Sequence, residues 1–248
     1  EGLTTLGKKA IDLLTATDNG PRVLIDVKHL SARARREYYQ IARDRGFPVI
    51  GSHIAMAGID RFPDDPADTR DDHDCHFFSR WSINFSDEDA RAVHETDGIV
   101  GLAIHEDRMP GGKALDQLKE MKKLIKKGVM LEEHLRATYL QVLMSNIFQF
   151  ILAIGEKSAW TRLMIGSDYD GIMNPFDSYP KTHFFNRMMY DIEQFLENPQ
   201  AVMIGKEGRE YQLPAEEVKK SMFGYTPAEI CQLIGLKNFE HFVARHFH

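Results

Sequence analysis

The sequence is poor in cysteine and has no excess of basic residues. Cys75 and Cys231 are its only cysteines, and neither stands in a CxxC pair or another metal-binding spacing. Two isolated thiols give no disulfide framework, which favours a reducing, cytoplasmic environment, although a signal upstream of Glu1 would change that expectation. With a net charge of -6, the chain also lacks the concentrated Lys/Arg surface that nucleic-acid binding needs.

Long apolar runs and nucleotide-binding motifs are absent from the sequence as well. No apolar stretch reaches the ~20 residues that a membrane-spanning helix needs, and the most apolar run, 139–154, is interrupted by polar residues. We therefore expect no membrane span. No GxGxxG motif or P-loop follows any apolar run, which argues against the common nucleotide-binding folds.

Four short apolar runs end in polar residues that could carry chemistry. The runs span 22–27, 48–52, 98–104 and 163–167, and they lead to Lys28-His29, His53, His105 and Asp168. Continuous rather than alternating apolar runs are typical of parallel strands that are covered on both faces. The sequence therefore predicts four parallel strands with functional side chains at their carboxyl ends.

Helical segments separate these runs. Predicted helix signals are Ser31 and Gly46 at the ends of one helix, a Ser86/Asp89 capping box, a long apolar helix over 131–154, and a helix start at Thr226-Pro227. Strand–helix alternation favours a (β/α) barrel or a doubly wound sheet. We expect one domain over 1–248, with a polar insertion loop at 60–80 and a helical C-terminal region at 183–248.

Two histidines and an aspartate stand at equivalent strand ends. In a parallel barrel, His29 and His53 would lie at one rim, where neutral imidazoles can bind Zn²⁺ or a related ion. The alternative is that each histidine only caps its strand through a hydrogen bond. Asp168 can act as a general base toward a metal-activated water, or it can be a turn residue, and the spacing leaves both roles open.

At these residues the sequence resembles a known family. Residues 26–31 (DVKHLS) resemble the D-x-x-H-[VL]-S motif of the M19 peptidases, the renal dipeptidase family of the amidohydrolase superfamily. Residues 48–53 (PVIGSH) and 166–171 (GSDYDG) resemble its P-V-[IF]-x-S-H and G-[SG]-D-[FY]-D-G motifs, and residues 2–7 resemble its G-L-T-x-x-G helix start. The order and spacing of the motifs match over most of the chain.

The resemblance implies an α/β fold that is the C-terminal half of a TIM-like (β/α)8 metal-dependent hydrolase barrel. It implies that His29 and His53 bind one metal of a two-zinc site and that Asp168 handles the proton of the attacking water. It also implies dipeptides as substrates and amide hydrolysis as the reaction. His105 falls near the place of a family residue beside the scissile carbonyl.

Three departures from the family pattern bear on activity. The family's H-x-D motif and bridging Glu belong upstream of residue 1, so this chain alone would hold zinc weakly or not at all. The family's substrate-binding Arg-Asn pair reads Ile83-Asn84 here, which leaves Arg80 and Arg61 as substitutes that are out of register. The 60–80 loop is longer than the family's link, and we expect His73 and His76 within it to be exposed to solvent.

Half a barrel leaves two unpaired sheet edges, so we expect a partner for this surface. The partner would be the missing N-terminal half or a second copy of the chain in a homo-oligomer. Two other functions stay open. The displaced arginine favours a diverged amidohydrolase that acts on another amide or on a lactone, and the absence of upstream ligands would favour a non-catalytic assembly domain with the same fold.

Overall fold

A three-stranded parallel sheet lies at the centre of the structure. The computed structural model describes residues 2–18, 20–63, 76–171 and 174–247. Strands β1 (Ile50–Ile54), β2 (Ile99–Leu102) and β3 (Leu163–Ile165) pair in the order β1-β2-β3, and both pairings are parallel. All four residues of β2 are buried, as its continuous apolar run predicts for a strand that is covered on both faces.

The first predicted strand, 22–27, is not a strand of this sheet. It lies beside β1 but makes a single parallel bridge to it, between Asp26 and Ile50, with the Val27 N–H donating to the Ile50 carbonyl. The prediction of four parallel strands is therefore wrong, because three are found among the described residues. The physical reason is local: the Asp26 carboxylate accepts the Lys28 N–H at 3.0 Å, which is turn chemistry that competes with a strand ladder.

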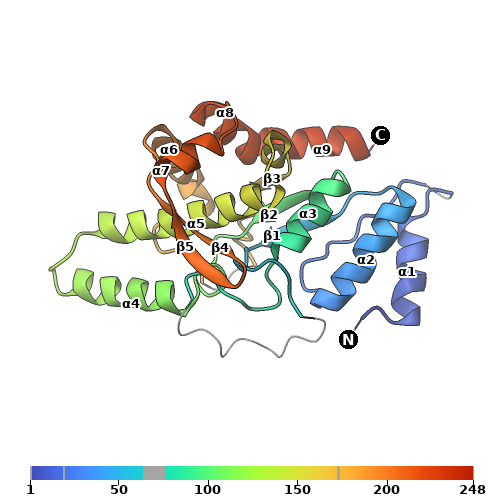
Figure 1. Cartoon of the computed structure of the whole chain (residues 1–248), viewed down its shortest axis with the longest axis horizontal. Helices are drawn as coiled ribbons and strands as arrows, with labels where there is room; N and C mark the ends of the chain where they lie inside the picture. Colours follow the sequence, from blue (N-terminus) through green and yellow to red (C-terminus); the bar gives the residue numbers. More distant parts are fainter. Residues whose placement is uncertain (1, 19, 64–75, 172–173, 248) are drawn as a thin grey trace.

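Helices pack beside the sheet and form both ends of the molecule. Helix α2 (Ala32–Arg45) begins after Ser31, whose hydroxyl accepts the Ala34 N–H, and ends at Gly46 with a φ of 65°, as predicted. Helix α3 (Asp87–Glu95) begins with the predicted capping box. In Figure 1, α1 (Thr5–Thr15) and α2 lie at one end of the molecule, and α4 (Gly112–Lys126) lies at the other.

Helix α5 (Glu132–Ile154) is the long core helix. By length and composition alone it could cross a membrane, but 61% of its most apolar window is buried inside the protein. Its polar residues bind the backbone of β4 (Val202–Lys206), since Gln149 pairs with both the N–H (2.8 Å) and the carbonyl (3.0 Å) of Gly205 and Ser145 Oγ accepts the Met203 N–H. The polar residues that interrupt the apolar run thus satisfy a neighbouring strand.

The C-terminal region contains a β-hairpin that the sequence did not predict. Strands β4 and β5 (Arg209–Leu213) pair antiparallel across the two-residue turn Glu207-Gly208, in which both residues have positive φ. Most side chains of β5 are polar and at least partly exposed, so the strand lacks a strong apolar pattern. The expectation of a helical region over 183–248 is corrected to this extent.

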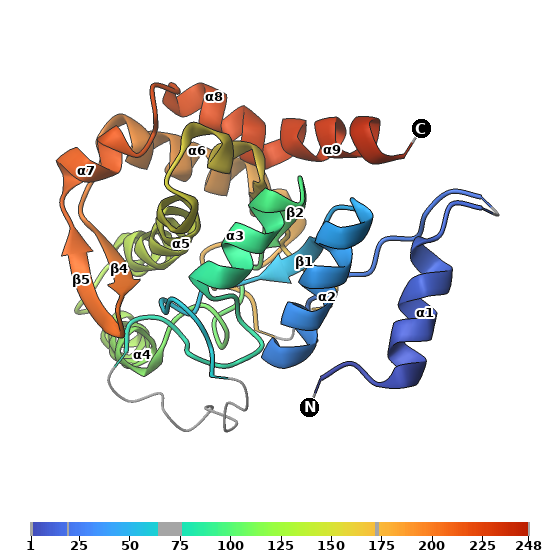
Figure 2. The same cartoon turned by 45° about the vertical axis from the view of Figure 1, so that its right-hand side comes forward.

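The remaining C-terminal elements are helical. They are α6 (Phe185–Glu197), α7 (Ala215–Lys220), α8 (Pro227–Gln232), a π-helical turn η4 (Leu233–Lys237) and α9 (Asn238–His246). Two short 3-10 helices stand earlier in the chain: η2 (Lys157–Thr161) precedes β3, and η3 (Thr182–Phe184) precedes α6. The predicted capping box at Thr226 and Glu229 opens α8. Figures 1 and 2 show α8 and α9 running along one side of the molecule.

Part of the predicted 60–80 loop, namely 64–75 with His73, lies outside the described residues. The C-terminal end of the loop is bound to the hairpin, because the N–H groups of Phe77 and Phe78 donate to the Glu210 carboxylate at 2.7 and 3.1 Å. His76 is half-buried, so the expectation that it is exposed is wrong.

Candidate active site

Three side chains that were predicted to share one rim converge in the structure. Nε2 of His29 lies 3.1 Å from Nε2 of His53, and Nε2 of His53 lies 3.8 Å from Oδ2 of Asp168. His53 belongs to β1, and Asp168 follows β3 by three residues. The single bridge between Asp26 and Ile50 keeps the irregular 22–27 segment beside β1, so His29 still reaches His53. The juxtaposition that parallel strand ends predict is therefore present.

His29 and Asp168 both have left-handed backbone conformations. Their φ angles are 77° and 56°, which few non-glycine residues adopt. Such conformations cost free energy and tend to occur at functional sites. Asp168 is also a turn residue, which was one of the two roles that the sequence allowed, since its carbonyl accepts the Gly171 N–H. A Cβ at residue 171 would lie 2.4 Å from Asp168 Oδ1, so the glycine leaves room for the carboxylate.

A hydrogen-bond relay orients His53. The Ser52 hydroxyl donates a hydrogen bond to Asp26 Oδ2, and Ser52 Oγ lies 2.7 Å from His53 Nδ1. A hydroxyl can donate only one hydrogen bond, and the ionised Asp26 carboxylate can only accept, so the Ser52 hydroxyl uses its one hydrogen in the bond to Asp26. Ser52 Oγ therefore accepts the Nδ1–H of His53, and the lone pair of His53 stays on Nε2, the atom that faces His29. Asp26 Oδ1 in turn accepts the N–H groups of Lys28 and Ser52.

Two glycines let the strand ends approach one another. A Cβ at Gly166 would lie 2.0 Å from the Ser52 carbonyl oxygen, and one at Gly101 would lie 2.4 Å from the same atom. Either contact would force the backbone apart, because non-bonded atoms do not approach so closely. The first glycine of the GSDYDG segment therefore serves the close packing that delivers Ser52, His53 and Asp168 to one place.

Burial and neighbouring cations favour neutral side chains at this site. Burial lowers the pKa of both His29 and His53, and the charges of Lys28 and Arg108 lower the pKa of His29 further. The charge of Asp168 partly offsets the lowering at His53. Lys28 is 4% exposed, and burial together with Arg108 lowers its pKa to about 7. Both imidazoles are therefore neutral at pH 7, which is the form that binds metal ions.

The two histidine nitrogens fit a shared divalent metal ion. Two nitrogens that bind one zinc ion at about 2.0–2.1 Å and at a near-tetrahedral angle are about 3.3 Å apart. The separation between His29 and His53 is close to that value, at 3.1 Å. Across the ranges that the structure describes, no group of three or more His, Cys, Asp or Glu residues is arranged to hold a metal ion. Two histidines alone are fewer protein ligands than a catalytic zinc ion normally has.

The two arginines that the sequence offered for substrate binding are held elsewhere. Arg80 Nη2 donates to the Gly208 carbonyl in the hairpin turn at 3.1 Å. Arg61 lies 3.5 Å from Glu88 of α3, and more than half of its side chain is exposed. The hairpin that provides the partner of Arg80 was itself not predicted. Binding of substrate by Arg80 or by Arg61 stays a prediction.

His105 lies in the loop after β2 and is 9% exposed. Its Nδ1 accepts the Asp107 N–H at 3.1 Å, and its backbone forms an antiparallel bridge with Pro175. Burial, and then the charge of Arg108, lower the pKa of His105. The charge of Lys28 also lowers this pKa, and the charge of Asp168 raises it. The structure therefore places His105 within electrostatic reach of the strand-end residues, while its contact with substrate stays a prediction.

Four residues of this site were given no role from the sequence. Asp26 and Ser52 lie within the matched motifs, and their hydrogen bonds to each other and to His53 give them their role. Lys28 is buried, and its ammonium donates to the Ile83 carbonyl at 3.3 Å. Arg108 has no motif to signal it, but it stands three residues after His105 in a loop that follows a predicted strand, which could have drawn attention to it.

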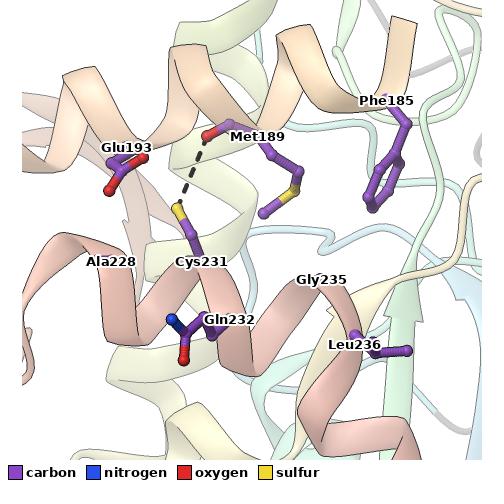
Figure 3. Close-up of a pocket in the computed structure, with 8 residues that line it drawn as sticks. All are labelled: Phe185, Met189, Glu193, Ala228, Cys231, Gln232, Gly235 and Leu236. Carbon is purple, nitrogen blue, oxygen red and sulfur yellow. Dashed lines mark hydrogen bonds between the residues drawn. The ribbon is translucent and has the colours of Figure 1, made fainter. Parts of the chain in front are cut away.

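A separate groove between α6 and α8 contains none of these residues. Figure 3 shows Met189 and Glu193 of α6 facing Cys231 of α8, with Leu236 at one end. Cys231 Sγ donates to the Met189 carbonyl at 3.7 Å, and burial raises the pKa of the thiol to about 12. At neutral pH this cysteine is protonated and is a poor nucleophile, so the groove is not a candidate for catalysis.

Comparisons with known proteins show a likeness in fold. No sequence family and no curated protein sequence matches the chain. Among solved structures, dipeptidase AC, described as a metallopeptidase of family M19, matches with a TM-score of 0.59 at 14% identity, over 100% of this chain and 50% of its own. A metallopeptidase from Rhodobacter sphaeroides, solved with a phosphinate mimic of the dipeptide L-Ala-D-Ala, matches with the same TM-score and identity, over 100% of this chain and 48% of its own.

The chain spans about half the length of these two metallopeptidases. At 14% identity the likeness establishes the fold alone, and at that level it confirms the resemblance to the M19 peptidases that three short motifs predicted. The structure is an α/β fold with a parallel sheet, similar over its full length to about half of an M19 metallodipeptidase.

Proposed function

We propose that the chain is part of a metal-dependent hydrolase that cleaves the amide bond of dipeptide-like substrates. One observation carries the proposal: Nε2 of His29 and Nε2 of His53 lie 3.1 Å apart, with the Asp168 carboxylate 3.8 Å from the second histidine. The likeness in fold to two metallopeptidases supports the same reaction class. Both of those proteins are metallopeptidases, and for the present chain peptide hydrolysis is a proposal.

His29 and His53 would hold zinc or a related divalent ion through Nε2. Asp26 and Ser52 keep His53 in the tautomer that can bind a metal. A divalent ion bound there would supply positive charge that polarises a carbonyl and lowers the pKa of water. Because a catalytic zinc normally has three protein ligands, we propose that further ligands come from the part of the fold that the two longer metallopeptidases have in addition.

Asp168 is the residue that would move the proton. Its side chain is 28% exposed, so water and substrate can reach the carboxylate. As general base it would take a proton from the water that attacks the carbonyl carbon, and it would then give this proton to the amine nitrogen as the C–N bond breaks. Its turn conformation and the space at Gly171 hold the carboxylate toward His53.

Cobalt binding and dipeptide hydrolysis test the proposal. Titration of the longest natural form that contains this chain with Co²⁺ should give a visible spectrum of nitrogen-bound cobalt that is lost in His29→Ala and in His53→Ala. His94→Ala is the matched control, because His94 is half-buried and hydrogen-bonded to Ser158, outside the cluster. A cobalt spectrum that neither alanine variant changes would contradict the metal site.

Hydrolysis of alanyl-alanine should be assayed in the longest natural form that contains this chain, and Asp168→Asn should abolish it.

A non-catalytic assembly domain is the second candidate function. One observation favours it, namely that two histidines and one aspartate fall short of a complete metal centre among the described residues. An H-x-D motif and a metal-bridging Glu encoded upstream in the gene would support the enzyme. Cobalt binding without any hydrolysis in the longest natural form would support the assembly domain.

We also propose that another polypeptide covers the surface beside 22–27. No strand pairs with the outer edge of this segment in the described part of the chain, and Val23 is 53% exposed. Leu6 and Leu13 of α1 are 76% and 81% exposed. Open backbone edges and exposed apolar side chains favour association. A dimer in sedimentation experiments would identify a second copy of the chain as the partner, and a monomer would favour the additional half that the longer metallopeptidases possess.

A further inference from the structure

We infer that a cavity between α3, α5 and the β4–β5 hairpin binds an aliphatic α-amino acid in its zwitterionic form. The cavity has a volume of about 240 Å³. Side chains of both charges line it, the carboxylates of Asp60 and Asp87 and the cationic groups of Arg91 and Lys206. None of the strand-end residues lines it, so the inference goes beyond the proposed function and does not depend on it.

Asp87 is a buried carboxylate that lacks a cationic partner. It is 6% exposed, and its Oδ1 accepts a hydrogen bond from Gln149 Nε2 at 2.7 Å. Gln149 is itself fixed by two hydrogen bonds to the backbone of Gly205, so the carboxylate is held in one orientation. In the described part of the chain, no group donates to Oδ2, and no Lys, Arg or His forms an ion pair with Asp87. Buried charges are normally paired, so a bound cation would supply what this carboxylate lacks.

The position of Asp87 at the start of α3 does not explain its burial. An acidic residue in the first turn interacts favourably with the helix dipole, but Glu88 and Asp89 stand there too, and Asp89 forms the capping box. Burial, with a smaller contribution from the charge of Asp60, raises the pKa of Asp87 to about 7, against the Gln149 hydrogen bond and the charge of Arg91. An ammonium group at Oδ2 would favour the ionised carboxylate and so remove this cost of burial.

Asp60 is the second carboxylate of the cavity. Its Oδ2 accepts the N–H of Glu207 in the hairpin turn at 2.8 Å, and none of the described residues donates to its Oδ1. Its negative charge acts on Asp87, so the two carboxylates together attract a cation. An ammonium group has three N–H donors, which is enough to serve both carboxylates. A metal ion is less suited, because the residues that the structure describes contain no group of three or more His, Cys, Asp or Glu arranged to hold one.

Arg91 and Lys206 bring positive charge to the same cavity. Both side chains are exposed, and Arg91 Nη1 donates to the Ala153 carbonyl at 3.3 Å. Neither cation forms an ion pair with a carboxylate within the described ranges. These charges would repel a simple amine but attract the carboxylate of an amino acid.

The cavity also has an apolar surface, which Leu152, Ile204 and Leu213 provide. Small-molecule sites commonly combine such a surface with a few polar groups that fix the orientation of the ligand. A ligand that matches all three features has an ammonium group, a carboxylate and a short hydrocarbon side chain. Aliphatic α-amino acids have this combination of groups.

Calorimetric titration with L-leucine and two analogues tests the inference. The longest natural form that contains this chain is titrated with L-leucine, with isopentylamine, which lacks the carboxylate, and with 4-methylpentanoate, which lacks the ammonium group. We expect L-leucine to bind about tenfold tighter or more than either analogue, because each analogue loses one charge-assisted contact. Binding of either analogue as tightly as L-leucine would overturn the inference, and so would the absence of L-leucine binding at millimolar concentration.

Asp87→Asn should weaken the binding of L-leucine about tenfold or more. The asparagine can still accept from Gln149, so the variant should fold, but it has no charge to offer an ammonium group. Arg91→Met should narrow the difference in affinity between L-leucine and isopentylamine. Asp44→Asn, at an exposed helix position, is the matched control and should bind L-leucine as the unmodified chain does. His53→Ala should also retain the binding. Unchanged affinity in Asp87→Asn, or an equal loss in His53→Ala, would overturn the inference.

Discussion

Ser52 Oγ lies 2.7 Å from Nδ1 of His53, and this contact determines which nitrogen of His53 can bind a metal ion. With the serine proton donated to Asp26, the Nδ1 of His53 must carry a hydrogen, and Nε2 keeps the lone pair. Ser52→Ala removes the group that fixes this tautomer and the ring orientation. We expect the affinity for Co²⁺ to fall about 10- to 100-fold, the usual cost of losing such an outer partner, as measured by spectroscopic titration.

Ser158→Ala is the control for this change. Ser158 also stands between a histidine and a carboxylate, since its hydroxyl lies 2.7 Å from His94 Nε2 and donates to Glu156. That group is outside the strand-end cluster, so cobalt affinity should not change. An equal loss in both serine variants would show that the effect is general destabilisation rather than orientation of His53.

Neutralising Asp168 should lower the pKa of His53 further. The negative charge of Asp168 favours the protonated imidazolium and therefore raises the pKa of His53, against the larger effect of burial, which lowers it. Asp168→Asn removes the opposing charge, so His53 should titrate at a lower pH in the metal-free chain, as followed by NMR of its ring nitrogens. The pKa of His53 should stay unchanged in Asp170→Asn, because Asp170 is exposed and is not among the charges that act on His53. An unchanged or higher pKa in Asp168→Asn would show that the two side chains are not neighbours in solution.

Local sequence signals predicted the parts of the fold that depend on local chemistry. Ser31 and Gly46 bound α2 because a hydroxyl and a left-handed glycine satisfy the ends of a helix wherever the helix lies. His29, His53 and Asp168 were predicted to meet because the carboxyl ends of parallel strands share one edge, and the structure brings them together. These inferences needed no knowledge of distant contacts.

The parts that were missed depend on tertiary contacts. Segment 22–27 reads as a strand, but Asp26 uses its carboxylate for the turn and for Ser52, so only one bridge to β1 forms. The hairpin β4–β5 is stabilised by side chains of α5, more than fifty residues upstream. The residue pattern of β5 itself is too polar to predict a strand.

Arg35 should be among the residues whose loss destabilises the fold most. It is fully buried and makes two bonds to Asp89, at 2.9 and 3.2 Å, and it also donates to the carbonyls of Leu30, Ser82 and Asn84. Burial alone would raise the pKa of Asp89, but Arg35 more than offsets this and holds it below its usual value. Arg35→Met leaves the carboxylate without its counter-ion, which should cost about 3–5 kcal/mol in urea unfolding.

Arg33→Met is the comparison for this prediction. Arg33 lies on the same helix and pairs with Glu37 at 3.6 Å, but 61% of its side chain is exposed. Its loss should change stability by ~0–1 kcal/mol, as for other surface pairs. Similar losses in the two variants would contradict the assignment of Arg35 as the residue that ties the loop after His29 to α3.

Asp87 should make the folded protein less stable as the pH rises from about 4 to 7. Burial raises its pKa from the ordinary 3.8 to about 7, against a hydrogen bond from Gln149 Nε2 at 2.7 Å. Between these two values the folded state keeps a proton that the unfolded state has released, so the destabilising contribution is absent below pH 4 and complete above pH 7. Asp87→Asn can still accept from Gln149 but carries no charge. The free energy of unfolding of Asp87→Asn should therefore equal that of the unmodified chain at pH 4 and exceed it by on the order of 2–4 kcal/mol at pH 8.

Asp44→Asn is the control at an exposed helix position, where Asp44 accepts a similar hydrogen bond from Gln40. The stability of this variant relative to the unmodified chain should not differ between the two pH values. A gain in Asp87→Asn that is the same at both pH values would trace the effect to packing rather than to the charge of the buried carboxylate.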